Sequence, residues 1–210
     1  MNKSFRDTPI VLALALIAPA TASAQNTPRY TEADVRFMQG MIGHHAQALA
    51  MTALIPARTS RQDIRSLGQR ITVSQKDEIA MMRQWLTDRH QPVPTSDAMH
   101  GHQAAAEHPM NMPGMAISDT LMPGMLTAEQ LSELARANGN EFDRLFLKDM
   151  IHHHEGALVM VASLLGTSGS AQEAEVFRFA SEVDSDQRAE IARMNALLDT
   201  LGSTGAKMHR

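Results

Sequence analysis

The chain has 210 residues and a formal net charge of −4, and it contains 16 methionines and 10 histidines but no cysteine. A mildly acidic chain without a basic block is not expected to bind nucleic acid. The absence of cysteine excludes disulfides and thiolate metal sites, so an exported form would depend on its core for stability.

The N-terminal residues have the features of a secretory signal peptide. A short basic region precedes an apolar run over residues 10–20, and Ala22-Ser23-Ala24 provides an A-x-A cleavage site. The run is shorter than the roughly 20 residues that a membrane span needs. We therefore predict a signal peptide over residues 1–24 and a periplasmic mature chain that begins at Gln25, with no stable membrane span. An uncleaved N-terminal anchor is the alternative.

Residues 25–90 predict a first helical hairpin. A capping-box-like start at Thr31 leads into a helix that Pro56 should end, and Ser60 should begin a second helix that ends before Pro92. Apolar residues in both helices recur at steps of three and four, which is typical of a helix with one buried face. This face carries Phe37, Met41, His44, Ala48 and Met51 in the first helix, and Ile64, Leu67, Ile71, Gln75, Met82 and Leu86 in the second.

Residues 91–126 are rich in Met, His, Pro and Gly and have no helical period, so we predict an exposed linker. The sequence M-P-G-M occurs in it twice. Its Pro-Gly step favours a turn that would bring the thioethers of Met112 and Met115, and those of Met122 and Met125, together. Core packing explains methionine poorly in such a segment, so we interpret these four as soft-metal ligands. A linker that is merely rich in methionine is the alternative.

Residues 127–202 predict a second hairpin with a short leading helix capped by Thr127, and residues 203–210 a tail. Asn140 should cap a third long helix that stops at Gly166, and a fourth follows. The buried face of the third helix carries Phe142, Phe146, Met150, His153, Ala157 and Met160. Two hairpins that each bury one stripe predict an all-α fold, a four-helix bundle joined by a Met/His-rich linker.

The two hairpins repeat each other. Residues 37–51 align with residues 146–160, and downstream Gln75, Glu78 and Met82 align with Gln187, Glu190 and Met194. The Gln and Glu of each half share a helix face. Either they support the nearby histidines by hydrogen bonds, or they form a buried polar network that fixes helix register.

Each half carries a His-His pair with a methionine one helical turn away. Imidazole suits both copper states and Cu(I) accepts thioether sulfur, so this spacing can bind copper. The alternatives are core packing for methionine and a hydrogen bond alone for histidine. The candidate ligands of this type are Met41, His44, His45 and Met51 in the first half, and Met150, His153, His154 and Met160 in the second.

These blocks together resemble the CopM-like periplasmic copper metallochaperones, a family with a doubled His-His motif. The doubled M-I-x-H-H and Q-x-x-E-I-x-x-M blocks and the M-P-G-M linker carry the resemblance, over roughly residues 31–200. It implies a ferritin-like helical bundle that binds Cu(I) and Cu(II) through the methionines and histidines named above, for resistance or delivery. The first half has Gly43-His-His-Ala-Gln where the second has His152-His-His-Glu-Gly, which leaves open whether both halves bind metal equally.

We therefore expect a copper-binding protein that is not an enzyme. Its partners would be copper ions and a copper-exporting or copper-accepting periplasmic protein. One alternative is a ferritin-like di-metal oxidase, although no Glu-x-x-His occurs in the bundle helices. The other is a helical adaptor module that binds no metal.

Overall fold

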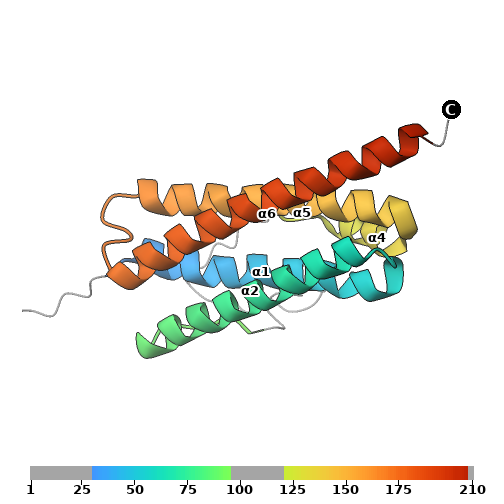
Figure 1. The fold of residues 1–210 in the computed structure, drawn as a ribbon. Helices are drawn as coiled ribbons and strands as arrows, with labels where there is room; N and C mark the ends of the chain where they lie inside the picture. Colours follow the sequence, from blue (N-terminus) through green and yellow to red (C-terminus); the bar gives the residue numbers. More distant parts are fainter. Residues whose placement is uncertain (1–29, 96–120, 208–210) are drawn as a thin grey trace, which may run out of the picture.

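The computed structural model describes residues 30–95 and 121–207, with side chains up to residue 202. These residues contain five helices and no strand (Figure 1). The helices are α1 (Glu32–Arg58), α2 (Gln62–Asp88), α4 (Ala128–Arg136), α5 (Gly139–Gly166) and α6 (Ala174–Lys207). The predicted all-helical bundle of two hairpins is thereby confirmed.

The hairpins α1–α2 and α5–α6 lie against each other through α1 and α5, which run antiparallel in the middle of the bundle (Figure 1). Helices α2 and α6 flank this central pair, and the short α4 covers it near the turn between α1 and α2. This arrangement brings the midpoints of α1 and α5 together. Residues at equivalent positions of the two halves therefore meet at the centre of the molecule.

The expected apolar stripes form the core. Met41, Ala48 and Met51 of α1, and Phe142 and Met150 of α5, have no exposed surface. They divide between two clusters, one toward each end of the bundle. The exception is Met160, which is only half-buried and packs against the rim of the first cluster.

The helix ends agree with the sequence where a capping box is present. Thr31 and Thr127 each accept a hydrogen bond from the backbone N–H three residues on. The side chain of that later residue in turn accepts a hydrogen bond from the backbone N–H of the threonine. Three expected boundaries were wrong. Helix α1 passes through Pro56 to Arg58, because a proline in the last turn removes a single backbone bond. Helix α5 begins before Asn140, and α6 continues to Lys207.

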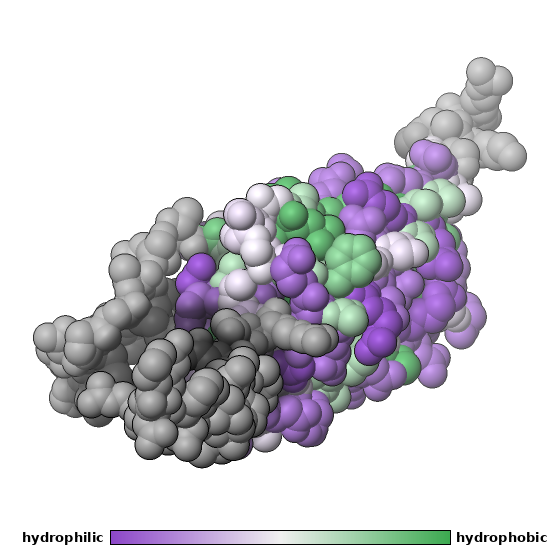
Figure 2. Space-filling view, turned by 90° about the vertical axis from the view of Figure 1, so that its left-hand side faces the viewer, coloured by the Kyte–Doolittle hydropathy of each residue, from purple (hydrophilic) through white to green (hydrophobic). Residues whose placement is uncertain are grey.

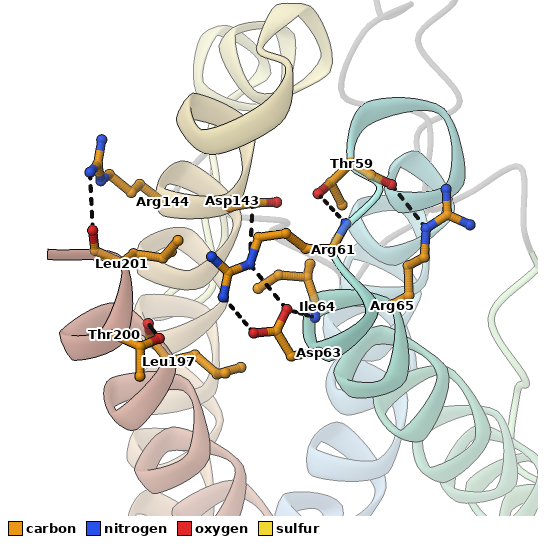
Figure 3. A network of polar contacts seen from close by, with 10 residues as sticks. All are labelled: Thr59, Arg61, Asp63, Ile64, Arg65, Asp143, Arg144, Leu197, Thr200 and Leu201. Carbon is orange, nitrogen blue, oxygen red and sulfur yellow. Dashed lines mark hydrogen bonds and ion pairs between the residues drawn. The ribbon is translucent and has the colours of Figure 1, made fainter. Parts of the chain in front are cut away.

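A polar network ties the turn between α1 and α2 to the second hairpin (Figure 3). The guanidinium of Arg61 donates to Asp63 at 3.1 Å and lies 3.9 Å from the buried carboxylate of Asp143 on α5. Arg65 donates to the Thr59 carbonyl at 2.9 Å, which holds the turn against α2. The two hairpins are thus joined at this end by charge as well as by apolar contact.

At the opposite end of the bundle, Glu173 joins α2 to α6. Its carboxylate accepts from Trp85 Nε1 at 3.0 Å and from the guanidinium of Arg89, which stacks over the Trp85 ring at 4.4 Å. Figure 2 shows this end of the molecule, where hydrophilic residues surround a hydrophobic patch. None of the described helices is both long and apolar enough to span a membrane.

Candidate metal centre

The two His-His pairs meet at the centre of the bundle. His44 and His45 lie in the middle of α1, His153 and His154 in the middle of α5, and none of the four has exposed surface. The rings of His44 and His153 are in contact, with centroids 3.8 Å apart and planes tilted by 36°. The internal repeat thus becomes a cluster of four buried imidazoles.

Each of these imidazoles makes a hydrogen bond through its Nε2 atom. His45 donates to the carboxylate of Glu78 on α2, and His154 donates to Glu190 on α6 at 2.6 Å. His153 donates to the backbone carbonyl of His44 at 3.0 Å. His44 donates to the carbonyl of Pro123, also at 3.0 Å. All four partners are oxygen acceptors, so in each case the hydrogen is on Nε2.

The Nδ1 atoms of the same four rings are buried and have no hydrogen-bond partner among the described residues. A neutral imidazole with its hydrogen on Nε2 carries a free lone pair on Nδ1. Buried polar atoms are normally paired, so four equivalent exceptions at one place need an explanation. Histidine ligands of metals commonly donate their other ring N–H to a carboxylate or a carbonyl, which is the arrangement observed here.

The rings at the centre are kept neutral. Burial lowers the pKa of His44 to about 3, with a further contribution from neighbouring His45. Burial also lowers the pKa of His153 well below its ordinary value, and the adjacent His44 adds to this effect. A histidine must be unprotonated to bind a metal, so these two are ready to act as ligands at neutral pH.

Carboxylates connect the imidazole cluster to the surface between α2 and α6. Glu78 also accepts from the Ser74 hydroxyl at 2.9 Å and lies on the wall of a cavity of about 220 Å³, together with Asp77, Glu182 and Asp186. Burial raises the pKa of Asp186, as do the charges of Glu78, Glu190 and Glu182. This cleft therefore has a negative potential directly outside His45 and His154.

The structure bears on both interpretations of the Gln-x-x-Glu motif. Glu78 and Glu190 contact the imidazoles directly. Gln75 and Gln187 are buried beside them, yet both polar atoms of Gln75 and the Oε1 atom of Gln187 have no partner among the described residues. The glutamates thus support the histidines, whereas the glutamines do not complete a polar network there.

The candidate methionines fall into three groups. Met41, Met51 and Met150 are fully buried in the two apolar clusters. Met122 and Met160 are half-buried, and both approach the bare face of Gly40, at 3.4 and 3.5 Å from the position of a Cβ there. Met125 is also half-buried, and its backbone N–H donates to the Met122 carbonyl. The remaining two, Met112 and Met115, lie outside the described residues.

The expectation of an exposed linker is wrong for Met122 and for residues 124–126, which are half-buried or buried against α1 and α5, whereas Pro123 is exposed. Leu126 is 2% exposed, and Gln47 binds its backbone through both amide atoms. Pro123 and Gln47 were not predicted from the sequence as neighbours of the site. The sequence indicates them only indirectly, because the two halves of the repeat differ at residues 43–47 and 152–156, where these contacts occur.

The side chains gathered here are unlike those of a carboxylate-bridged metal centre. Within residues 30–95 and 121–202, no three His, Asp or Glu side chains surround a common point in a way that could hold one ion. The free donor atoms at the centre are four imidazole nitrogens, with methionine thioethers in the core on either side. Such a set suits an ion that accepts soft ligands and low coordination numbers.

Comparison with known proteins gives the following matches. Residues 34–198 match the family model described as Domain of unknown function (DUF305). No curated protein matches the chain significantly. The crystal structure of a DUF305 fragment from Deinococcus radiodurans is similar, with a TM-score of 0.65 and 28% identity, over 82% of this chain and 99% of that chain.

Structures of CopM are also similar to this chain. CopM in the Cu(II)-bound form has a TM-score of 0.59 and 27% identity, over 80% of this chain and 96% of that chain. CopM in the Cu(I)-bound form has a TM-score of 0.57 and 24% identity over the same shares, a likeness of fold. These matches confirm the resemblance expected from the sequence.

Proposed function

The chain belongs to the DUF305 family, and from this premise we propose that it is a copper-binding protein whose principal ligands are the four buried imidazoles. The observation that carries the proposal is the set of four unpartnered Nδ1 atoms at the centre of the bundle. The similarity to CopM, of which a Cu(II)-bound structure is known, supports copper as the ion.

The chemistry of the site favours copper over harder ions. The unpartnered donors of the four rings are imidazole nitrogens, and the core on either side contains thioethers, both of which bind copper well. Mg²⁺ and Ca²⁺ need several oxygen ligands. Monovalent copper suits the apolar surroundings best, because burying a single charge costs less free energy than burying two.

The residues divide the work of binding. Four nitrogen ligands would come from His44, His45, His153 and His154, and the Nε2–H bonds hold each ring with its Nδ1 lone pair free. Glu78 and Glu190 would offset the positive charge of a bound copper ion, because each carboxylate accepts a hydrogen bond from a ligand ring, His45 or His154. The half-buried Met122 and Met160 offer thioethers nearer the surface than the imidazoles.

We propose further that the protein acts after export and without catalysis, in copper resistance, storage or delivery. The signal-like residues 1–24 support export. Delivery would require a copper-exporting or copper-accepting periplasmic protein as partner. Thioether ligands suit transfer between proteins, because they carry no proton and the ion can leave them without a proton transfer.

The test is the copper content of the mature protein isolated from the periplasm of copper-supplemented cells. We expect bound copper in the wild type and in His152→Ala, which changes an exposed histidine beside the second pair. The double variants His44→Asn/His45→Asn and His153→Asn/His154→Asn should each lose copper. Equal copper content in folded variants of both kinds would refute the proposal, and absence of copper from the wild type would favour the metal-free adaptor.

A further inference from the structure

The segment Met122–Leu126, which we call the strap, fits a seam between α1 and α5 that only glycine leaves open. Gly124 has a φ of +75°, and a Cβ at this position would lie 2.6 Å from the carbonyl oxygen of His152 and 2.7 Å from the Cα of Gly156. A Cβ on Gly156 would overlap with the carbonyl of Pro123. The strap and α5 therefore touch backbone to backbone.

The strap is also fixed by hydrogen bonds. The Nε2 atom of Gln47 donates to the carbonyl of Leu126 at 3.0 Å, and its Oε1 accepts from the N–H of Leu126 at 2.7 Å. A turn bond from Met125 N to Met122 O, of 3.1 Å, closes the strap on itself. The buried Leu126 side chain anchors its end in the core. A two-point clamp of this kind defines the position of the whole segment.

The two inner imidazoles differ in the partner of their Nε2–H group. His153 donates its Nε2–H to a carbonyl of α1, which is part of a rigid helix. The equivalent donor of His44 does not reach the carbonyl of His153 but binds Pro123 in the strap. The orientation of His44 therefore depends on a segment outside the helices, and that of His153 does not.

The sequence repeat breaks at the positions that hold the strap. Gly43 stands where the second half has His152, and Gln47 stands where it has Gly156. All four line the seam: Gln47 clamps Leu126, Gly156 makes room for Pro123, the His152 carbonyl contacts Gly124, and Met122 lies 3.5 Å from the Cβ position of Gly43. These two differences between the halves thus have a common structural origin.

We propose that the strap is a positioning element for His44. It holds the hydrogen of this ring on Nε2 and leaves the buried Nδ1 without a hydrogen bond to any described residue. Gln47 and Gly156 are the residues that position the strap. The ring-orientation part of this proposal concerns the metal-free protein. Its consequence, that copper binding by the first His pair depends on a docked strap whereas binding by the second does not, rests on the proposed function.

Nitrogen-15 NMR of the histidine rings in the metal-free mature protein tests the orientation. In Gly156→Ala and Gln47→Ala the Nε2–H signal of His44 should shift or exchange with solvent, while that of His153 stays close to its wild-type position. The matched controls are Gly166→Ala, at the open end of α5, and Gln39→Ala, whose amide donates to Pro92 outside the strap. Unchanged His44 signals in both strap variants, or equal changes in His153, would overturn the proposal.

A Cu(I) titration with chelator competition tests the consequence. Loss of a residue that orients a ligand typically lowers metal affinity by about 10- to 100-fold, so we expect this loss at the first pair only. If Gly156→Ala does not fold, Gln47→Ala alone decides, because Gln47 is only half-buried and its truncation leaves the backbone of α5 unchanged. Equal copper affinity of both pairs in the variants contradicts the inference, whereas a wild type that binds no copper contradicts the proposed function instead.

Discussion

The rings of His44 and His153 stack across the interface of the two hairpins with their centroids 3.8 Å apart, although the residues are 109 positions apart in the sequence. Two imidazolium ions could not share this position, because like charges at such a separation repel strongly where little water is present. Burial lowers the pKa of both rings, and the charge of His44 lowers the pKa of His153 further, so both rings stay neutral. The contact therefore links the interface between the hairpins to the protonation of the candidate ligands.

A first prediction concerns the pH dependence of stability in the metal-free protein. His44 stays neutral in the fold down to about pH 3, but in the unfolded chain it gains a proton below about pH 6.5. The unfolded state then binds more protons than the folded state. The free energy of unfolding should therefore decrease as the pH is lowered, by about 1.4 kcal/mol per pH unit for each such ring. Denaturant unfolding between about pH 7 and about pH 5 measures the slope.

The control for this slope is the double variant His44→Asn/His153→Asn. Burial and nearby Glu133 raise the pKa of Asp149 to about 6, so this carboxyl gives the opposite slope in the same window. Because Asp149 is present in both proteins, the difference between them isolates the two imidazoles. A folded double variant with the wild-type slope would show that these rings do not resist protonation.

A second prediction concerns Glu190, which accepts the Nε2–H bond of His154. In Glu190→Gln an oxygen acceptor remains but the charge is lost, and in Glu190→Leu both are lost. Copper affinity should fall in that order, to about 10- to 100-fold below wild type in the second variant. Chelator competition measures it, with the exposed Glu129→Gln as control. Wild-type affinity in Glu190→Leu would exclude a supporting role.

A third prediction concerns uptake through the cleft between α2 and α6. Asp186 and Glu182 line this cleft without contacting the imidazoles, so they should affect the rate of copper entry more than its affinity. The variant Glu182→Gln/Asp186→Asn should bind copper more slowly and with a weaker dependence on ionic strength. Stopped-flow mixing measures the rate. An unchanged rate would place the entrance elsewhere, with the strap side of the bundle as the next candidate.

A fourth prediction concerns stability at the end of the bundle shown in Figure 2. Glu173 accepts from both Trp85 and Arg89, so Glu173→Gln should lower the free energy of unfolding by about 1 kcal/mol. It should also change the fluorescence of Trp85, which is the only tryptophan. Asp184→Asn, which breaks the exposed pair with Arg188, should have no measurable effect. Equal effects of the two changes would show that the Glu173 contacts add nothing.

The parts of this structure that repeat along the chain could be predicted, and the parts that do not repeat could not. The spacing of residues such as Phe37, Met41 and His44 defines a buried helix face, and its recurrence defines the second hairpin. The position of the site could be predicted from this pattern, because the two halves place their histidine pairs in the middle of α1 and of α5. The strap could not be predicted, since the contact of Gln47 with Leu126 joins residues 79 positions apart in the sequence without any periodic pattern.

The assignment of methionines shows the same limit. A sequence stripe does not distinguish a thioether that fills the core from one that faces an opening. The structure places Met41 and Met150 in fully buried apolar clusters, but leaves Met160 half-buried beside Met122. The expectation that Cu(I) and Cu(II) bind through these methionines and histidines stays a prediction. The apolar surroundings of the imidazoles favour Cu(I) at this centre as well.

The most direct test of the account follows the four Nδ1 atoms during addition of Cu(I), which is diamagnetic and leaves histidine NMR signals visible. Nitrogen-15 spectra of the metal-free protein should show Nε2–H and a free Nδ1 for His44, His45, His153 and His154. On addition of copper, the Nδ1 signals of these buried rings should shift while their Nε2–H signals persist and exposed His152 is unchanged. Copper binding that leaves all four Nδ1 signals in place would contradict the assignment of the buried imidazoles as the copper ligands.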